Sequence, residues 1–300
     1  MHVLITGGTG FIGAALCRAL VARGDRVSVW TRSAAAAAAR VPPGVRTVEA
    51  LSQLVGDPVD AVVNLAGESL ASARWSPAHL QRCLDSRVRT TRRLLEWMQA
   101  GARPRTLISG SAIGWYGARG DEVLDEGAAA GDDGEFTVRL CRAWEAEALK
   151  AESMGVRCCR LRIGIVLERD GGSLAEMVPP FRLGLGGPMG SGRQGMSWIH
   201  RADLVAMILW LLDTDSARGV YNGTAPQPVD NRSFARALGR ALRRPAILPM
   251  PGFALKAIVG GMAQLVLSGQ HVVPHRALVQ GFTFRYPDLD SALAAIFREA

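Results

Sequence analysis

Two hydrophobic patterns take turns along the chain. Short apolar runs predict buried strands, at residues 2–6, 26–30, 45–50, 60–67, 105–111 and 156–167. Between them, apolar residues that recur every three or four positions predict helices, at 11–24, 76–101 and 135–155. Strands that alternate with helices predict an α/β fold, a Rossmann-type doubly wound parallel sheet that binds its ligands at the carboxyl ends of the strands.

The pattern changes beyond about residue 165, where glycine and proline become denser. We therefore expect a nucleotide-binding domain over residues 1–165 and a smaller C-terminal substrate lobe over 166–300, with 198–223 returning to the first domain. The longest apolar stretch, 252–269, is too short to span a bilayer and contains a glycine pair. It predicts a packed amphipathic helix and no membrane contact.

Composition narrows the class of protein. Hydrophobic residues make up 48% of the chain, which excludes a disordered protein. The net charge is +8, but arginines are spread along the sequence, and one cluster on a predicted helix does not by itself indicate nucleic-acid binding. The five cysteines form no Cys-x-x-Cys pair, which is typical of reduced thiols, and we expect a cytoplasmic protein.

The first strand runs directly into the glycine-rich sequence TGGTGFIG, residues 6–13. Glycines between a strand and a helix permit a tight turn, let a pyrophosphate approach the backbone, and let the helix pack closely on the strand. Free N–H groups at the start of the helix then bind the phosphates. This position in the chain predicts a dinucleotide site.

The end of the second strand indicates which dinucleotide binds. An NAD site usually has an acidic residue there, whereas this strand ends at Trp30, Thr31 and Arg32 with no acid nearby. A cation suits the 2′-phosphate of NADP(H), so we predict NADP(H), with Arg32 and Ser33 as contacts. The predicted cofactor-binding residues are Thr6, Gly7, Gly10, Phe11, Ile12, Gly13, Thr31, Arg32, Leu65, Ala66, Gly67 and Glu68.

Several segments resemble the extended short-chain dehydrogenase/reductase superfamily. They are TGGTGFIG, NLAG (64–67), SGSAIGWYG (109–117), WIHRADL (198–204) and VYNG (220–223). Longer segments at 64–77, 180–200 and 269–289 resemble a subgroup labelled epimerase family protein, which has a C-terminal module of its own. The resemblance implies an NADP(H)-binding fold, and it implies a homodimer formed through helices such as 77–100 and 135–154.

The catalytic pair that the resemblance implies is missing. Superfamily members use Tyr-x-x-x-Lys, in which the lysine lowers the pKa of the tyrosine and holds the ribose. No Tyr-x-x-x-Lys occurs in this chain. If Glu145 matches the family's later glutamate, Thr137 and Cys141 stand at the two positions. Neither can replace a tyrosine activated by an ammonium group.

Three residues remain as catalytic candidates. Ser111 matches the family serine that hydrogen-bonds a substrate carbonyl, and Tyr116 lies just beyond it. Glu68 follows NLAG at a strand end that faces the cofactor. We expect Tyr116 or Glu68 to be the proton donor, although a loop carboxylate at the start of a helix explains Glu68 equally well.

Other polar and aromatic residues are weaker candidates. Arginines could clamp an anionic substrate, namely Arg87, Arg162 and Arg193, and each is also explained as a salt-bridging residue. We expect packing roles for His200, Trp75 and Trp198, and no metal site, because Pro274 interrupts the spacing of His271 and His275.

Two functions fit these observations. The first is an NADP(H)-dependent oxidoreductase or nucleotide-sugar-epimerase-like enzyme that acts on a small polar, conceivably anionic, substrate. The second is a non-catalytic NADP(H)-binding sensor or regulatory protein. The glycine loop and Arg32 support both, the missing pair favours the second, and Ser111, Tyr116 and Glu68 favour the first.

Overall fold

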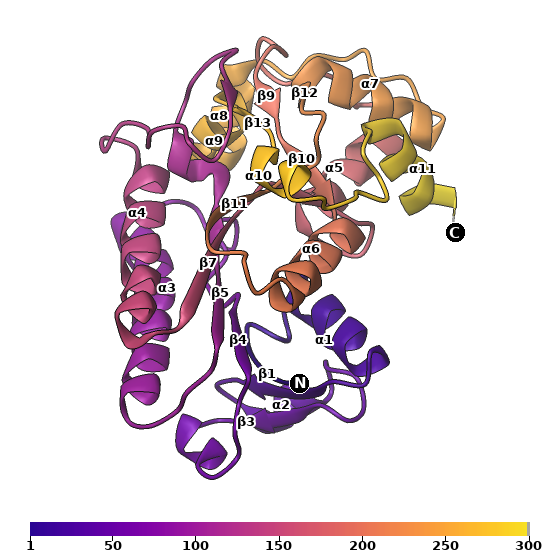
Figure 1. Cartoon of the computed structure of the whole chain (residues 1–300). Helices are drawn as coiled ribbons and strands as arrows, with labels where there is room; N and C mark the ends of the chain where they lie inside the picture. The colour runs from indigo at the N-terminus through magenta and orange to yellow at the C-terminus, as the bar shows by residue number, and fades with distance from the viewer. Residues whose placement is uncertain (299–300) are drawn as a thin grey trace.

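A seven-stranded parallel sheet forms the centre of the computed structural model, which describes residues 1–298 (Figure 1). Its order is β11-β7-β5-β4-β1-β2-β3, and it confirms the predicted Rossmann-type doubly wound sheet. The strands are β1 (His2–Thr6), β2 (Arg26–Trp30), β3 (Arg46–Val48), β4 (Ala61–Asn64), β5 (Thr106–Ala112), β7 (Arg157–Ile163) and β11 (Gly219–Gly223). The chain order reverses between β1 and β4, and ligands bind at such a point in this class of fold.

Helices cover both faces of the sheet. They are α1 (Gly13–Ala22), α3 (Pro77–Gln99), α4 (Phe136–Leu149) and α6 (Arg201–Asp213), with a short α2 (Ala34–Ala38) beyond β2. The 3-10 turns are η1 (Leu51–Leu54), η2 (Ile113–Tyr116) and η3 (Lys150–Met154). In Figure 1, α3 and α4 lie on one face of the sheet and α1 and α6 on the other.

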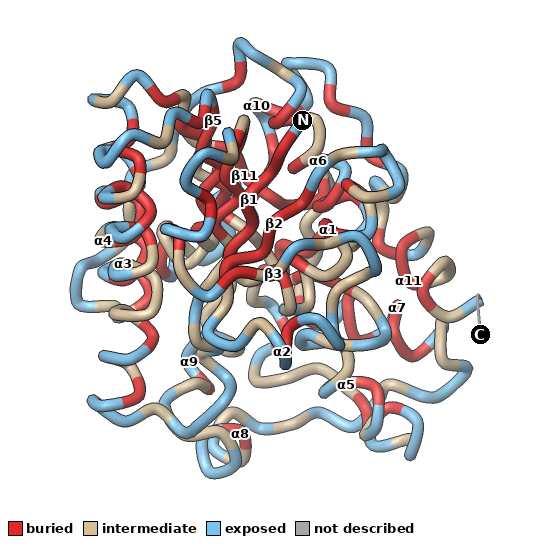
Figure 2. The backbone as a smooth tube through the Cα atoms, turned by 90° about the horizontal axis from the view of Figure 1, so that it is seen from below, coloured by how far each residue is buried: buried red, intermediate tan, exposed pale blue. Residues whose placement is uncertain are grey.

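Alternation along the strands sets these two cores. Val3 and Ile5 pack in the cluster that contains Leu16 of α1 and Leu204 of α6. Leu4, between them, packs in the cluster that contains α3 residues. Successive side chains of a strand point to opposite faces, so a short apolar run buries itself on both sides. Figure 2 shows these strands as a buried centre inside an exposed coat.

The C-terminal part has a core of its own, built on α5 (Gly172–Arg182), α7 (Asn231–Leu242) and α11 (Leu289–Arg298). Three short pairs of strands surround it: β8 (Ile165–Leu167) with β10 (Trp198–His200), β9 (Gly195–Met196) with β12 (Val229–Asp230), and β6 (Val123–Leu124) with β13 (His271–Val272). Residues 198–223 divide between the two parts, because β10 pairs with β8 while β11 joins the large sheet. The domain boundaries at 165 and 166 stay a prediction.

Two elements differ from the sequence prediction. The strand expected over 156–167 breaks at Gly164, where the chain leaves the large sheet and β8 begins. The single helix expected over 252–269 is instead α8 (Gly252–Val259), η4 (Gly260–Met262) and α9 (Ala263–Leu267), followed by α10 (His275–Val279). Gly260 has φ of 62°, which ends α8. Among residues 1–298, no helix is long and apolar enough to cross a membrane.

Candidate functional site

The glycine loop has the geometry of a phosphate cradle. Gly7 has φ of 70°, a conformation that favours glycine, and the Gly10 N–H donates to the Gly7 carbonyl at 2.9 Å. A Cβ on Gly13 would lie 2.2 Å from that carbonyl oxygen. The first turn of α1 can therefore approach β1 only with glycine at position 13. These residues fit a bound pyrophosphate, with the N–H groups at the start of α1 aimed outward.

The end of β2 presents the residues predicted to select the cofactor. Arg32 is exposed and makes no ion pair with any of residues 1–298. Ser33 caps α2, since its hydroxyl accepts the Ala36 N–H at 3.4 Å. Thr31, which precedes them, is partly exposed. The Glu49 carboxylate accepts the Ala34 N–H at 2.7 Å and makes no ion pair with Arg32, so this cation is available to an anionic 2′-phosphate.

The segment after β4, residues 65–68, forms a wall of the candidate site on the side opposite the end of β2. Thr6 donates its hydroxyl to Asn64 Oδ1 at 2.6 Å and accepts the Ala66 N–H at 3.1 Å, so it ties the end of β1 to the start of this segment. Leu65 and Ala66 are partly exposed and Gly67 is exposed. This segment lies beside the glycine loop, because a Cβ on Gly7 would come 2.8 Å from the Leu65 carbonyl.

A segment of the C-terminal part, residues 170–172, packs against Phe11 of the glycine loop, and we call this segment the strap. A Cβ on Gly171 or Gly172 would lie within 3 Å of the Phe11 ring, at 2.7 and 2.9 Å respectively. Arg201 stacks over the same ring and pairs with Asp170 at 2.6 Å. Phe11 thus anchors the loop to both parts of the molecule, while Ile12 beside it is partly buried.

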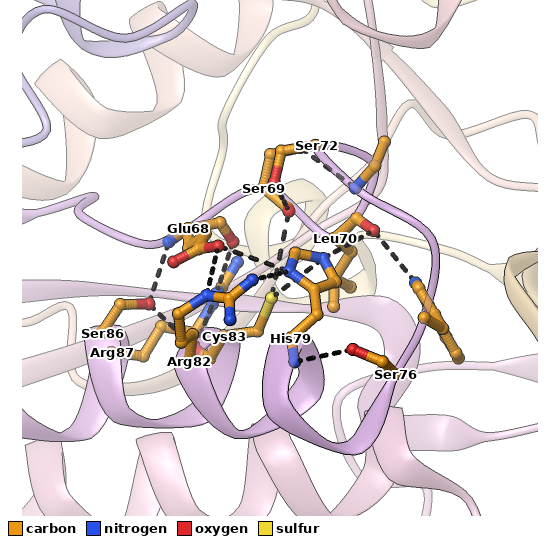
Figure 3. A network of polar contacts seen from close by, with 12 residues as sticks. Glu68, Ser69, Leu70, Ser72, Ser76, His79, Arg82, Cys83, Ser86 and Arg87 are labelled. Carbon is orange, nitrogen blue, oxygen red and sulfur yellow. Dashed lines mark hydrogen bonds and ion pairs between the residues drawn. The ribbon is translucent and has the colours of Figure 1, made fainter.

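Glu68 sits at the carboxyl end of β4, where α3 holds it by several contacts (Figure 3). Its carboxylate Oε1 lies 3.3 Å from His79 Nδ1 and 3.3 Å from Arg82 Nε. Its N–H donates to Ser86 Oγ at 2.9 Å, and its carbonyl accepts from Arg87 Nη1 at 2.9 Å. The side chain keeps 34% of its surface exposed, so the carboxylate is held in place and still open.

His79 supports Glu68 from behind, and the sequence did not single it out. It is 1% exposed, and its Nε2 lies 3.6 Å from Cys83 Sγ, one helical turn along α3. Burial raises the pKa of the Cys83 thiol, so this cysteine is not a ready nucleophile. The spacing of His79 and Cys83 on the helix that follows NLAG is the signal that could have found this residue.

Arg87 lies deeper in the same wall. Its Nη1 donates to the carbonyls of Glu68 and Cys83, each at 2.9 Å, and the guanidinium carbon lies 5.2 Å from the centre of the Trp144 ring. Its Nε is buried and has no hydrogen-bond partner. No carboxylate of residues 1–298 pairs with it, and burial lowers the pKa of this guanidinium.

Ser111 and Tyr116 belong to a closed network. Ser111 donates to Glu145 Oε1 at 2.7 Å, and Arg162 donates to both oxygens of that carboxylate, at 2.8 and 3.0 Å. Arg162 Nη1 also donates to the Tyr116 hydroxyl at 3.0 Å. That hydroxyl in turn donates to Asn222 Oδ1 at 2.7 Å. The network joins β5, η2, α4, β7 and β11.

Every member of this network is buried. Tyr116 is 0% exposed and Ser111 is 3% exposed. Burial raises the pKa of the Tyr116 phenol. Burial alone lowers the pKa of a guanidinium, but the hydrogen bonds and charge of Glu145 raise the pKa of Arg162 above its ordinary value. Both hydroxyls are thus committed to neighbouring side chains.

The two positions of the missing pair are also enclosed. Thr137 and Cys141 on α4 are both buried. The Cys141 thiol donates to the Ala112 carbonyl at 3.5 Å, and burial raises the pKa of this thiol to about 11. Neither side chain offers an acid or base at neutral pH.

The weaker candidates each pack against or pair with neighbouring side chains. Arg193 is exposed and pairs with Asp121 at 3.4 Å. His200 is buried against Tyr286 and accepts the Ala202 N–H, and burial lowers its pKa. Trp198 is fully buried, whereas Trp75 is partly buried against Phe136. His271 and His275 flank Pro274, and no cluster in the described part of the chain could hold a metal ion.

Fold and site together define a Rossmann-type nucleotide-binding protein with a second small lobe. The model of the NAD-dependent epimerase/dehydratase family matches residues 3–222, and that of a domain of unknown function, DUF1731, matches residues 250–296. The chain belongs to the NAD-dependent epimerase/dehydratase family.

Individual relatives cover the whole chain. The chain is 43% identical to the chloroplastic epimerase family protein SDR39U1 homolog of Arabidopsis thaliana, over 99% of this chain and 87% of the relative. It is 37% identical to the human epimerase family protein SDR39U1, over 99% of both chains. A crystal structure of the human protein (isoform 2) with NADPH superimposes with a TM-score of 0.88 and 35% identity, over 100% of both chains. UDP-glucuronic acid 4-epimerase from Bacillus cereus shares the fold, at a TM-score of 0.78 and 16% identity over 99% of this chain and 98% of that one.

Proposed function

We propose that this protein is an NADP(H)-dependent oxidoreductase or epimerase-like enzyme for a small polar substrate, with Glu68 as the group that exchanges a proton with it. One observation carries the choice of Glu68. Its carboxylate is partly exposed at the carboxyl end of β4, whereas the hydroxyls of Ser111 and Tyr116 are enclosed. Family membership and the NADPH bound to the human relative support the cofactor.

The chain's own residues divide the work of holding the cofactor. Gly7, Gly10 and Gly13 allow the pyrophosphate to reach the N–H groups of α1. Arg32 provides a cation for the 2′-phosphate, while Phe11 under the strap limits access of water from above. When bound, the cofactor supplies or accepts the hydride.

The proton is handled at the Glu68 carboxylate. Arg82 donates to one oxygen, with His79 Nδ1 3.3 Å from the same atom, so the carboxylate keeps a fixed direction. A general acid or base in such a position contributes about 10²–10⁴-fold to a rate. Ser111 and Tyr116 build the rigid floor beneath this wall, and Tyr116 would become a proton donor only if its bond to Asn222 opened.

A second function is favoured by a different observation. Thr137 and Cys141 occupy the positions of the missing pair and are both buried, so neither can perform the usual catalytic chemistry of the superfamily. A non-catalytic NADP(H)-binding sensor keeps the cradle and needs no proton donor. We place either protein in the cytoplasm, as a homodimer formed through α3 and α4.

Cofactor binding and turnover are tested separately. Thermal unfolding is followed with NADPH and with NADH, because a ligand at a hundredfold excess over its dissociation constant stabilises the folded state by about 2.7 kcal/mol. We expect a shift with NADPH that weakens in Arg32→Ala. Transfer of deuterium from labelled NADPH is then followed over a panel of carbonyl compounds and sugar nucleotides.

The variants decide between the two functions. Glu68→Gln should bind NADPH as the parent does and lose about 10²-fold or more in turnover, with Glu122→Gln as an exposed control. Parental turnover in Glu68→Gln would remove Glu68 from the mechanism. Binding of NADPH without turnover of any compound would favour the sensor.

A further inference from the structure

The Arg87 guanidinium is partly buried and makes no ion pair with residues 1–298. Both bonds from its Nη1 go to neutral carbonyls, its Nε has no partner, and its Nη2 makes no hydrogen bond to residues 1–298. Burying a charge is costly unless it is paired. We propose that Arg87 binds a carboxylate group of the substrate, an inference that rests on the proposed function of the same wall.

Two other arginines, the buried Arg162 and the partly buried Arg157, show how the fold alone can stabilise an enclosed guanidinium. Arg162 is paired with Glu145 through two hydrogen bonds. Arg157 also lacks a carboxylate, but it donates to the carbonyls of Leu211, Leu212 and Ala217 near the end of α6, where the helix dipole is negative. Arg87 has neither a carboxylate partner nor the carboxyl end of a helix, because the α3 carbonyl that it contacts, that of Cys83, lies in the interior of the helix. Folding alone therefore does not account for its charge.

The neighbouring glycine gives access to the guanidinium. Gly67 is exposed and ends the NLAG segment, one residue before Glu68. A Cβ at Gly67 would lie 2.8 Å from the guanidinium carbon of Arg87, closer than two such carbons can pack. The bare backbone thus lets the cation lie directly behind the exposed surface at the carboxyl end of β4. A substrate held at Glu68 lies next to it.

The charges of this wall favour a carboxylate over a phosphate. A single unpaired guanidinium balances one negative charge, and its planar fork matches a planar carboxylate. A phosphate monoester carries about 1.5 to 2 negative charges at neutral pH. The charge of the Glu68 carboxylate already acts on Arg87 and would repel the second charge of a phosphate. Trp144 stacks on the guanidinium and leaves its edge, rather than its face, for the ligand.

The smallest carboxylates test this inference without knowledge of the substrate. The NADP⁺-loaded protein is titrated with formate and acetate, with the neutral formamide and acetamide, and with inorganic phosphate. The signals followed are the Arg87 Nε–H and the Trp144 indole N–H in ¹H–¹⁵N spectra, because both groups are buried without a partner. NADP⁺ binding is measured first on the same sample, so its failure would reject the proposed function and not this site.

We expect saturable shifts with formate and acetate and none with the amides. Binding should weaken at least about tenfold in Arg87→Gln, read at Trp144, and partly recover in Arg87→Lys. Gly67→Ala keeps the charge but displaces the guanidinium, and it should weaken binding similarly, while the exposed Arg89→Gln on the same helix should not. Equal response to amides, tighter binding of phosphate, or unchanged binding in Arg87→Gln would each overturn the assignment.

Discussion

Arg162, which is buried, and Arg87, which is partly buried, differ in the partners of their guanidinium groups. Arg162 donates to Glu145 and Tyr116, and the Glu145 carboxylate also accepts from Ser111. Arg87 has only two carbonyls and an aromatic ring. The pKa of Arg162 is raised while that of Arg87 is lowered by burial, so the same side chain is stabilised as a cation in one place and not in the other. The hydrogen-bond network around Arg162 stabilises the fold. Arg87, in contrast, is where a bound ligand would add stabilising interactions.

Breaking the closed network should have the largest effect. Arg162→Met leaves the buried Glu145 carboxylate with only the Ser111 hydroxyl and, at 3.9 Å, Arg160, and loss of a partner from a buried ion pair costs about 3–5 kcal/mol in comparable cases. The free energy of unfolding, measured in urea, should fall by that amount. Arg142→Met removes an exposed ion pair from α4, the helix that carries Glu145. It should change the free energy of unfolding by about 1 kcal/mol or less. Similar values for the two variants would contradict the distinction drawn here.

Removing only the hydroxyl of Tyr116 should lower the free energy of unfolding by an intermediate amount that depends on pH. Tyr116→Phe strands Asn222 Oδ1 and one N–H of Arg162, at a cost of about 1–3 kcal/mol at neutral pH. Because burial raises the pKa of folded Tyr116, its contribution is complete below the unfolded pKa of about 10 and is lost as pH rises through the folded value. The free energy of unfolding, measured in urea between pH 8 and 11, should therefore fall more steeply with pH for the parent than for the variant.

The smallest effect on stability should come from the unpaired arginine. Arg87→Met removes two bonds to carbonyls and also relieves an uncompensated charge, so we expect a change of about 1 kcal/mol or less in the free energy of unfolding. The same urea experiment measures it beside Arg162→Met. A loss as large as that of Arg162→Met would mean that Arg87 is structural.

Local sequence patterns were enough for the sheet and the cradle. Strand, glycine loop and helix follow one another within the first 22 residues, and their geometry depends on near neighbours. The charged networks depend on distant ones: Tyr116 and Asn222 are 106 positions apart, and Glu145 and Arg162 lie on different elements. The family resemblance suggested Ser111 and Tyr116, and charge suggested Arg87, but neither could say which of these residues the fold had already engaged. His79 was missed because its partner Glu68 lies outside its own helix.

The break at Gly164 has a mechanical consequence. Its N–H bonds to Gly223 in the large sheet, and the next N–H, of Ile165, bonds to Ser197 beside β10. One continuous extended run thus belongs to both sheets in succession, with a glycine where a Cβ would meet the Ser197 carbonyl at 2.5 Å. The C-terminal part has no free hinge at this crossing. Rotation of the C-terminal part about this crossing would therefore break backbone hydrogen bonds to both sheets.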